Sequence, residues 1–431
     1  MFSAKGFASL QHGRRVQLAS RDMFKAYRQV PVAEEASKHN VIRLWHPGRQ
    51  RVVYCLAYVL LFGEAGSVLQ FNRLSTFIVA LASRLLAIPV QSFFDDFRFI
   101  SIADCAKSDW LHFQRLANWL GVIFDPKKDQ PHGPSITMLG NIEDCSLVPS
   151  RAVVRLSAKP CRLEEIRQSL LDILRDKALS SGLAARVRGK LLHVSATTPS
   201  RLGRASLPFL NEVADNKDCS WSQGLERDLL FALDALSRPH VLDFHLDSDA
   251  SNPVVAYTDA SFQMGSAGAE SRMCAIVIDA NFTQGVVTDV SQGTFGKLLD
   301  RKTQIGATEL LAIVTLLESF GRRMMGRKLA LFVDNVGVIY NVVNGCSKAA
   351  DLAAITFYTR LLLHEFSITP WLEHVPSEAN LADGGSRVGT SDAAAAEAGV
   401  ELAMIEDVQL PGDFPSTSYA DWLVHLRKRV T

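Results

Sequence analysis

Two short apolar runs, each ending in an aspartate, are the clearest strand signals in the chain. Residues 254–258 (Val-Val-Ala-Tyr-Thr) precede Asp259, and residues 329–333 (Leu-Ala-Leu-Phe-Val) precede Asp334. Apolar runs of this length, rich in β-branched and aromatic residues, are typical of buried strands. Between them, residues 307–313 place Glu309 among apolar residues in a pattern that predicts a helix.

Residues 151–210 predict helices. One apolar stripe recurs at helical spacing and consists of Leu163, Ile166, Leu170, Leu174 and Ala178. A second helix is predicted over residues 183–194, and it carries Arg186, Arg188 and Lys190. These helices would form a separate unit between the segment 1–150 and the strands that begin near residue 254.

The last forty residues have a different pattern. Residues 389–392 predict a loop and a helix cap that leads into a helix over residues 393–403. Pro411 and Pro415 then precede a short helix predicted over residues 419–429. This tail shows no chemistry of its own, so it either packs on the preceding domain or leads to a further domain.

Composition predicts an intracellular globular protein, cytoplasmic or nuclear. At 431 residues the chain is long enough for two to four domains, and its apolar fraction is 48%. No apolar run approaches about 18 residues, and the first residues lack a signal-peptide core, so no membrane association is predicted. The seven cysteines form no C-x-x-C pair, which predicts reduced thiols and no zinc site.

The net charge of +1 conceals a segregation of basic and acidic residues. Residues 1–51 contain 10 Lys or Arg against 3 Asp or Glu, and residues 151–210 contain 12 against 4. Residues 211–250 reverse the balance, with 3 basic and 9 acidic residues. A single basic helix is more often a solvated face, but two basic blocks suit contact with a phosphate backbone.

Four carboxylates occupy settings that favour a metal site: Asp259, Glu309, Asp334 and Asp383. Carboxylates that converge from strand ends and helix starts can hold two divalent cations about 4 Å apart, the geometry that cleaves phosphodiesters. Oxygen ligands of this kind favour Mg²⁺ or Mn²⁺ over zinc. Taken alone, an Asp at a strand end is more often a turn or a helix cap. Four such carboxylates, in this order along the chain, favour a metal site.

The residues around these carboxylates resemble the ribonuclease H domain of retroelement polyproteins. The matching motifs are YTDAS (257–261), ATELLAI (307–313), LFVDN (331–335) and VPSEANLADGGSR (375–387). The last of them, with Asn380, Ser386 and Arg387, looks most like the retrotransposon and pararetrovirus branch. Relatives often carry a histidine where this chain has Ser377-Glu378, and we give the nearby His374 no catalytic role. The resemblance implies an α/β domain with a five-stranded mixed sheet, the four carboxylates as ligands of two Mg²⁺ or Mn²⁺ ions, and an RNA–DNA hybrid as substrate.

The first half of the chain resembles a reverse transcriptase. Five motifs, A to E, occur in order at residues 21–32 (RDMFKAYRQVPV), 62–68 (FGEAGSV), 92–97 (SFFDDF), 120–128 (LGVIFDPKK) and 138–142 (MLGNI). Motif C begins with Phe93 instead of the commoner tyrosine, and motif B lacks the usual proline. The FG…SV form of motif B is similar to DIRS-like elements.

The reverse-transcriptase resemblance implies a role for each motif residue. Asp22, Asp95 and Asp96 would hold two Mg²⁺ or Mn²⁺ ions between the primer and the incoming deoxynucleoside triphosphate. Tyr27 would screen out a 2′-hydroxyl, and Gly63 would let the chain approach the nucleotide. Lys127 or Lys128 would lie near the leaving pyrophosphate. Since only 21 residues precede Asp22, we expect the fingers subdomain to be largely missing.

These inferences predict four parts: an α+β palm with an antiparallel sheet over 1–150, a helical thumb or connection with a linker over 151–250, the ribonuclease H-like domain over 251–390, and a tail over 391–431. The predicted function is an RNA-directed DNA polymerase with ribonuclease H activity from a retrotransposon, acting on an RNA template and a DNA primer. Arg186, Arg188 and Lys190 would contact the nucleic-acid backbone. The alternatives are an active ribonuclease H with an inactive palm, a non-catalytic nucleic-acid-binding remnant, and a decayed, unfolded product. The oligomeric state is left open.

Overall fold

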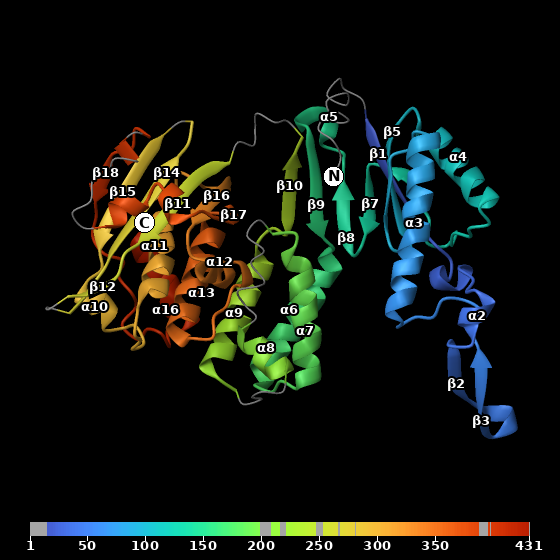
Figure 1. The fold of residues 1–431 in the computed structure, drawn as a ribbon, viewed down its shortest axis with the longest axis horizontal. Helices are drawn as coiled ribbons and strands as arrows, with labels where there is room; N and C mark the ends of the chain where they lie inside the picture. The colour runs from blue at the N-terminus through green and yellow to red at the C-terminus, as the bar shows by residue number, and fades with distance from the viewer. Residues whose placement is uncertain are drawn as a thin grey trace. The chain divides into compact units, whose positions relative to one another are not determined.

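The computed structural model describes residues 15–198, 208–215, 221–246, 253–265, 268–280, 282–387, 395–396 and 398–430 (Figure 1). The chain forms two compact units. The first comprises the described residues up to Ser157 together with Asp243–Leu246, and the second comprises the described residues of Ala158–Leu242 and Asp247–Thr431. No helix among the described residues combines the length and apolarity needed to cross a bilayer.

The first unit is built on a four-stranded antiparallel sheet in the order β4-β5-β1-β6. Its strands are β1 (Val16–Asp22), β4 (Val90–Phe93), β5 (Asp96–Ile102) and β6 (Gln130–Gly133). Every second residue of β5 is buried, so Phe97 and Phe99 point into one core. Two helices cover that core, α3 (Ala65–Leu85) and α4 (Ala106–Trp119). This is the antiparallel α+β arrangement that the sequence predicts for residues 1–150.

A second sheet, in the order β10-β9-β8-β7, completes the first unit. Its strands are β7 (Ser135–Met138), β8 (Asn141–Asp144), β9 (Val153–Ala158) and β10 (Val241–His245). The sequence pattern predicts a helical segment with a linker over residues 151–250. That assignment is wrong at its two ends, because β9 and β10 pair there, and Arg155 binds Asp243 at 2.8 Å across them.

The remaining elements of the first unit lie between β1 and α3, apart from one short helix after β8. They are η1 (Ala26–Gln29), α2 (Glu34–Ser37), β2 (Val41–His46), η2 (Pro47–Arg49), β3 (Arg51–Leu56) and α5 (Val148–Arg151). β2 and β3 form a two-stranded hairpin, which the sequence analysis did not predict.

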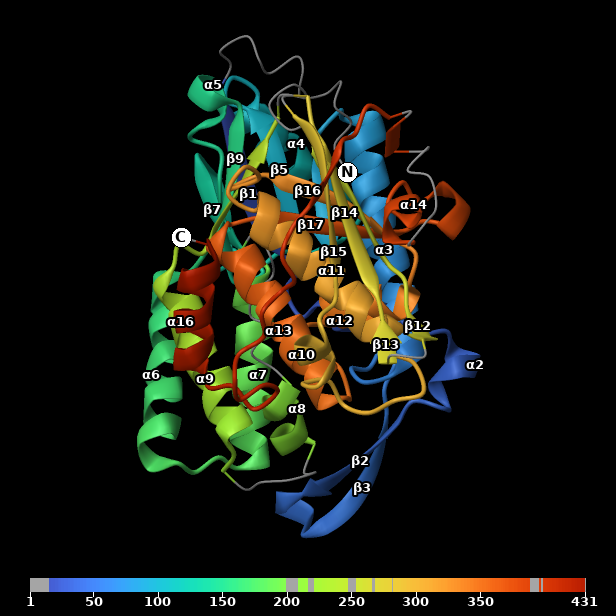
Figure 2. The same cartoon turned by 90° about the vertical axis from the view of Figure 1, so that its left-hand side faces the viewer.

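The second unit begins with helices that pack around one apolar core (Figure 2). They are α6 (Pro160–Asp176), α7 (Ser181–Ser195), α8 (Pro208–Ala214) and α9 (Gln223–Ser237). Ile166 and Leu170 of the predicted stripe are buried, whereas Ala178 lies beyond the end of α6. Ser180 and Ser222 cap α7 and α9 by accepting hydrogen bonds from backbone N–H groups of the first turn.

A mixed sheet of six strands follows, in the order β17-β16-β11-β14-β15-β18. The strands are β11 (Val254–Ala260), β14 (Arg272–Ile278), β15 (Thr283–Asp289), β16 (Lys328–Val333), β17 (Thr369–His374) and β18 (Leu402–Met404). A small hairpin, β12 (Gln263–Gly265) with β13 (Gly268–Glu270), follows β11. The prediction of five strands is therefore wrong by one. Residues 402–404 add the sixth strand, parallel to β15, where a helix over 393–403 was predicted. Residues 393, 394 and 397 of that predicted helix, and the predicted loop and cap at 389–392, lie outside the described part.

Helices cover this sheet and its connections. They are α10 (Gln292–Phe295), α11 (Ile305–Phe320), α12 (Val336–Asn344), α13 (Ala350–Glu365), η5 (Ser377–Ala379) and α14 (Asp383–Ser386). In helix α11, 12 of the 16 residues are buried between the sheet and α13. Such a helix is held by packing on all sides and gives its polar residues a fixed position.

The tail packs back on the second unit through α16 (Tyr419–Val430). Trp422 is fully buried, and its ring stacks on Tyr358 of α13 with centroids 4.7 Å apart. Arg429 binds Glu318 of α11 at 2.8 Å, and the Tyr358 hydroxyl donates to the same carboxylate at 2.8 Å. Of the two alternatives for the tail, packing on the preceding domain is the one that the structure contains.

Replacing Trp422 by alanine tests whether this tail stabilises the second unit. The change removes a fully buried indole, so we expect the free energy of unfolding to fall by about 3–5 kcal/mol. Urea denaturation followed by circular dichroism measures it. Val424→Ala, at an exposed position of the same helix, is the control and should change stability by less than about 0.5 kcal/mol. Equal small effects of both changes would contradict the packing role.

Candidate active sites

The first group of carboxylates lies where β1 meets the hairpin of β4 and β5. The antiparallel register places Asp22, the last residue of β1, opposite Asp96, the first residue of β5. Asp95 lies in the turn between β4 and β5, and its carbonyl accepts a hydrogen bond from the Met23 amide at 2.9 Å. Backbone pairing alone thus brings together Asp22, Asp95 and Asp96, as the motifs predicted.

Burial and mutual repulsion shift the protonation of this group. Burial, followed by the negative charges of Asp95 and Asp22, raises the pKa of Asp96 to about 6. Burial is also the main cause that raises the pKa of Asp95, to which the Asp22 charge adds. One cation opposes this repulsion, because Lys128 Nζ lies 2.7 Å from Asp22 Oδ1. Of the two candidate lysines, Lys128 is therefore the one that contacts the group.

Tyr27 lies in η1, immediately after this group, and is buried. Its ring stacks on Phe71 and also contacts Phe62, each with centroids 4.6 Å apart. Gly63 follows Phe62 with φ of +93°, a conformation that side-chain-bearing residues rarely adopt. Gly63 thus permits the turn that places the Phe62 ring against Tyr27. The nucleotide-binding roles of Tyr27 and Gly63 stay predictions.

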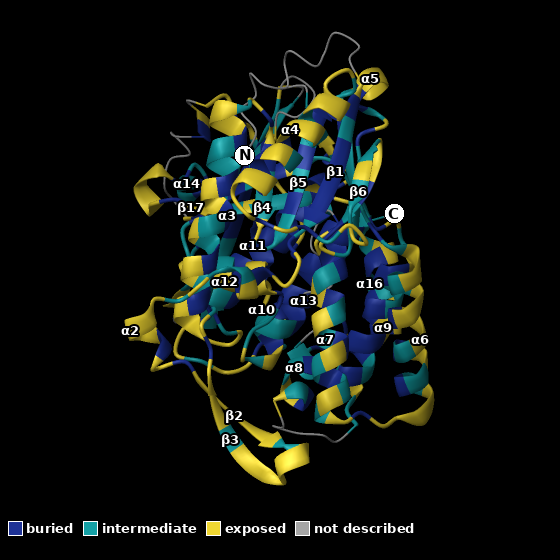
Figure 3. Ribbon diagram, turned by 90° about the vertical axis from the view of Figure 1, so that its right-hand side faces the viewer, coloured by how far each residue is buried: buried dark blue, intermediate teal, exposed yellow. Residues whose placement is uncertain are grey.

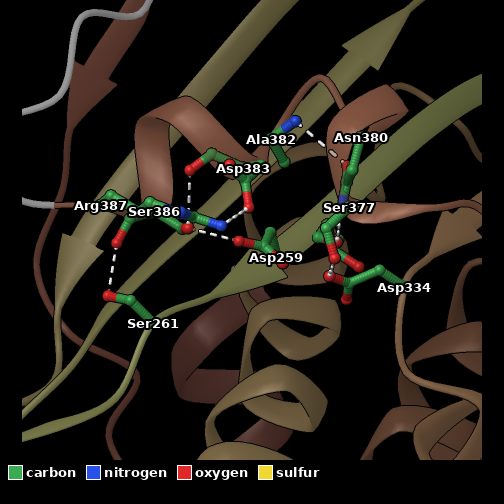
Figure 4. Close-up of polar contacts among 10 residues, drawn as sticks. Asp259, Ser261, Asp334, Ser377, Asn380, Ala382, Asp383, Ser386 and Arg387 are labelled. Carbon is green, nitrogen blue, oxygen red and sulfur yellow. Dashed lines mark hydrogen bonds and ion pairs between the residues drawn. The ribbon is translucent and has the colours of Figure 1, made fainter.

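The second group of carboxylates is positioned by a parallel strand pair. Strands β11 and β16 are neighbours with Thr258 opposite Val333, so the next residues, Asp259 and Asp334, emerge at the same edge of the sheet. Glu309 lies in the second turn of α11, which packs on β11. Asp383 is the first residue of α14, and Figure 4 shows it on one side of Asp259 with Asp334 on the other.

Hydrogen bonds fix these side chains (Figure 4). The Ser386 hydroxyl donates to Asp259 Oδ2, and the Ser377 hydroxyl donates to Asp334 Oδ2 at 2.9 Å. The Arg387 guanidinium binds Asp383 Oδ1 at 2.5 Å. Each carboxylate in this picture therefore has one partner that holds its orientation.

Asn380 attaches the last motif to the sheet. Its side-chain amide donates to the Thr258 carbonyl at 3.1 Å, and its side-chain oxygen accepts from the Ala382 amide at 3.2 Å. Asn380 is itself buried, so these two bonds are shielded from water. Through Asn380, these bonds link Thr258, which precedes Asp259, to Ala382, which precedes Asp383.

Burial makes this group electrostatically costly. It raises the pKa of Glu309 to about 8, and the charges of Asp334 and Asp259 add to the effect against a hydrogen bond from Asn335. It also raises the pKa of Asp259 to about 7, again with neighbouring carboxylates, Asp334 and Asp383, adding to the effect. A group of buried carboxylates with pKa values near neutrality is typical of a functional site.

The residues of the second group fit a hard divalent cation by two criteria. Glu309 Oε2 and Asp334 Oδ1 are buried oxygens that lack a hydrogen-bond partner among the described residues, and such atoms are costly unless a ligand satisfies them. All four donors are carboxylates, which suit Mg²⁺ or Mn²⁺. In the described part of the chain, no three His, Cys, Asp or Glu side chains already surround one point. Ser386 and Arg387 hold Asp259 and Asp383 instead.

A cavity of about 530 Å³ adjoins this second group. It opens beside Ser261, two residues after Asp259, and beside Arg387, the partner of Asp383. Its lining also includes Gln263, Gln292, the acidic Glu270 and the ion pair of Arg272 with Asp289. Amide and guanidinium groups of this kind can bind phosphate and ribose oxygens, so the cavity offers polar contacts next to the carboxylates.

The three basic residues predicted to contact nucleic acid all lie on α7. Arg188 forms an ion pair with Asp215 at 3.3 Å, and Lys190 forms one with Glu165. Arg186 is exposed. Two of the three predicted side chains therefore have acidic partners within the helices of the second unit, and contact with a phosphate backbone would have to compete with these pairs.

Several residues at the second site had no role in the sequence analysis. Ser377 occupies the place where relatives carry histidine, and it binds Asp334. Ser386 and Arg387 belong to the last motif but had no assigned partner, and they bind Asp259 and Asp383. Asn335 caps α12 and bonds Glu309. Its sequence signals are its place at the end of the LFVDN motif and its suitability as a helix cap directly after Asp334.

Comparisons with known proteins give structural likenesses only. No protein-family model matches the chain, and no curated protein matches it. Among solved structures it is similar to a foamy viral protease-reverse transcriptase in three complexes. With double-stranded DNA, the form designated dRH gives a TM-score of 0.42 at 13% identity over 84% of this chain and 57% of that chain. The complex with an RNA/DNA hybrid gives a TM-score of 0.38 at 10% identity, over 86% of this chain and 66% of that chain. A further complex with double-stranded DNA gives a TM-score of 0.39 at 13% identity, over 83% of this chain and 67% of that chain.

The chain thus spans about 57–67% of the length of these structures. At identities of 10–13% and TM-scores near 0.4, the likeness transfers neither activity nor partners to this chain. Function must therefore be argued from the chain's own residues.

Glu309→Gln tests the electrostatic cost at the second site. The folded pKa, about 8, lies above the ordinary value of 4.5, so the metal-free protein loses stability as pH rises from about 4.5 through 8. The neutral amide avoids this loss. In the presence of EDTA we expect the variant to be more stable than the unchanged chain by roughly 4–5 kcal/mol at pH 8.5 and by less than about 1 kcal/mol at pH 5.

Thermal denaturation at the two pH values measures this difference. Glu378→Gln makes the same chemical change at an exposed position and should leave the pH dependence unaltered. If the melting temperatures of the Glu309→Gln variant and the unchanged chain shift in parallel with pH, burial does not raise the pKa of Glu309, and the electrostatic cost at this site is absent.

Proposed function

We propose that the chain is an RNA-directed DNA polymerase joined to a ribonuclease H, derived from a retrotransposon. One observation carries the proposal: each compact unit contains its own group of converging carboxylates, Asp22, Asp95 and Asp96 in the first and Asp259, Glu309, Asp334 and Asp383 in the second. Nucleotidyl transfer and phosphodiester hydrolysis both use carboxylates that hold two divalent cations. Two such groups in one chain support two activities on nucleic acid.

In the proposed polymerase, Asp22, Asp95 and Asp96 would hold Mg²⁺ or Mn²⁺. The cations, when bound, would supply charge stabilisation for the transferred phosphoryl group. Lys128 reaches Asp22 from an exposed position, so its ammonium would exchange Asp22 for oxygens of the triphosphate. Tyr27 would select deoxynucleotides through contact with the sugar, and its packing on Phe62 and Phe71 supports a fixed ring position.

In the proposed nuclease, Asp259, Glu309, Asp334 and Asp383 would hold the cations, which would supply an activated water when bound. Ser386 and Ser377 keep two of these carboxylates oriented. Arg387 would leave Asp383 for a phosphate oxygen of the substrate, because the guanidinium lies at the edge of the adjoining cavity. The polar lining of that cavity would bind the RNA strand of an RNA–DNA hybrid.

One reaction with two readouts tests the proposal. The chain is given a labelled DNA primer on a labelled RNA template with Mg²⁺ and deoxynucleoside triphosphates, and extension and RNA cleavage are measured together. Asp95→Asn should reduce extension by at least about 100-fold and leave RNA cleavage intact. Asp334→Asn should reduce RNA cleavage by a similar factor and leave extension intact. Asp95→Asn and Asp334→Asn are matched controls for each other, because they make the same chemical change in different units.

Other outcomes separate the alternatives. Cleavage without extension, abolished by Asp334→Asn, would leave an active ribonuclease H beside an inactive palm. Neither activity, combined with salt-dependent binding of a duplex, would indicate a non-catalytic nucleic-acid-binding protein. Loss of both activities in either variant would show that the two groups do not act as separate sites, and the proposal would fail.

A further inference from the structure

The hairpin of β2 and β3 leaves apolar side chains in water. Its six pairs run from Val41 opposite Leu56 to His46 opposite Arg51. Ten of the twelve residues in the two strands are exposed, and Figure 3 shows the hairpin almost entirely in the colour of exposed residues. An isolated two-stranded hairpin is marginal in water, and contiguous exposed apolar residues mark interaction surfaces. The exposure therefore calls for a partner.

The pairing register sorts the hairpin's side chains into two faces. Because successive residues of a strand point to opposite sides, one face carries Val41, Arg43, Trp45, Val52, Tyr54 and Leu56. We call it the aromatic face. Trp45 is 55% exposed and Tyr54 is 69% exposed. Arg43 lies directly opposite Tyr54, and Trp45 is the diagonal neighbour of Tyr54. Two accessible rings and a guanidinium thus share one surface.

Charge indicates what kind of partner fits this surface. Residues 36–63 contain Lys38, Arg43, Arg49 and Arg51 and no Asp or Glu. A second copy of the chain would bring the same positive charges to the contact, which opposes self-association. A polyanion would be attracted, and aromatic rings beside arginines are the combination by which proteins bind single-stranded nucleic acid.

The base of the hairpin is anchored, although its strands are exposed. The Ala57 amide donates to the Asn40 carbonyl at 2.8 Å, and the Val32 amide donates to the Tyr58 carbonyl at 3.0 Å. The Leu60 amide donates to the Val30 carbonyl at 3.1 Å, next to η1. These bonds hold the hairpin to the segment that follows Tyr27, so the aromatic face has a defined support.

We propose that the aromatic face of the β2–β3 hairpin binds single-stranded nucleic acid. Unpaired bases would stack on Trp45 and Tyr54, and the phosphates between them would contact Arg43 on the same face and Arg49 in the connecting turn. A duplex would bind less well here, because the faces of its bases are already stacked on one another. This binding requires neither of the two proposed catalytic activities.

Fluorescence anisotropy with a labelled oligothymidylate of about 12 nucleotides tests the proposal. The full chain carries Asp95→Asn and Asp334→Asn and is kept in EDTA, so failure of either proposed activity cannot influence the result. Adding Trp45→Ala together with Tyr54→Ala should weaken binding of the oligonucleotide at least tenfold. Trp119→Ala removes another tryptophan of the same unit, 84% exposed, and should leave the affinity unchanged.

Two further variants separate stacking from charge and folding. Trp45→Phe with Tyr54→Phe keeps both rings and should retain most of the affinity, which also shows that the hairpin folds. Arg43→Gln should lower the slope of log affinity against log salt concentration by about 0.7, the contribution of one phosphate contact on a single strand. An unlabelled duplex of equal length should compete poorly.

Three results would overturn the proposal. The alanine pair could leave the affinity for the oligothymidylate unchanged, which would place its binding elsewhere. The duplex could compete as well as the single strand, which would leave phosphate contact without stacking. Light scattering could show that the unchanged chain is a dimer that the alanine pair dissociates, with binding unaffected. The hairpin would then be a contact between copies.

Discussion

Both candidate sites depend on holding like-charged carboxylates close together, and backbone hydrogen bonds supply the constraint. Asp22 and Asp96 are paired by an antiparallel ladder, and Asp259 and Asp334 emerge from adjacent parallel strands. Repulsion between carboxylates works against each arrangement, as the raised pKa values of Asp96, Asp259 and Glu309 indicate. Sheets resist this repulsion because separating the side chains would break the ladder. A loop carrying the same residues would move them apart.

Local partners lower the cost of each arrangement without removing it. Lys128 neutralises part of the first group, while Ser386, Ser377 and Arg387 each take one carboxylate of the second. Two buried oxygens, Glu309 Oε2 and Asp334 Oδ1, remain unsatisfied among the described residues. A divalent cation at the second site would coordinate these two oxygens. A cation would also have to displace Arg387 from Asp383, which couples metal binding to the neighbouring cavity.

The sequence predicted the parts of the fold whose signal is local. Residues 254–258 and 329–333 form strands because each run is rich in apolar residues and buries every second one, and the aspartates that follow are brought together as expected. The strand Leu402–Met404 could not be predicted, since its pairing with β15 joins residues more than a hundred positions apart. The β2–β3 hairpin was not predicted, because its apolar residues face water and do not form one buried face. The choice between Lys127 and Lys128 required the position of Asp22, and the partners of Ser377 and Ser386 required the folded loop.

The central claim is that two independent carboxylate groups hold divalent cations in separate units. Counting bound Mn²⁺ by electron paramagnetic resonance tests it most directly, without dependence on any activity. The account predicts two classes of ions, with Asp95→Asn and Asp96→Asn together removing only one class, and Asp259→Asn and Asp334→Asn together removing only the other. Ion binding that neither pair of changes alters would contradict the account, as would complete loss of binding from either pair alone.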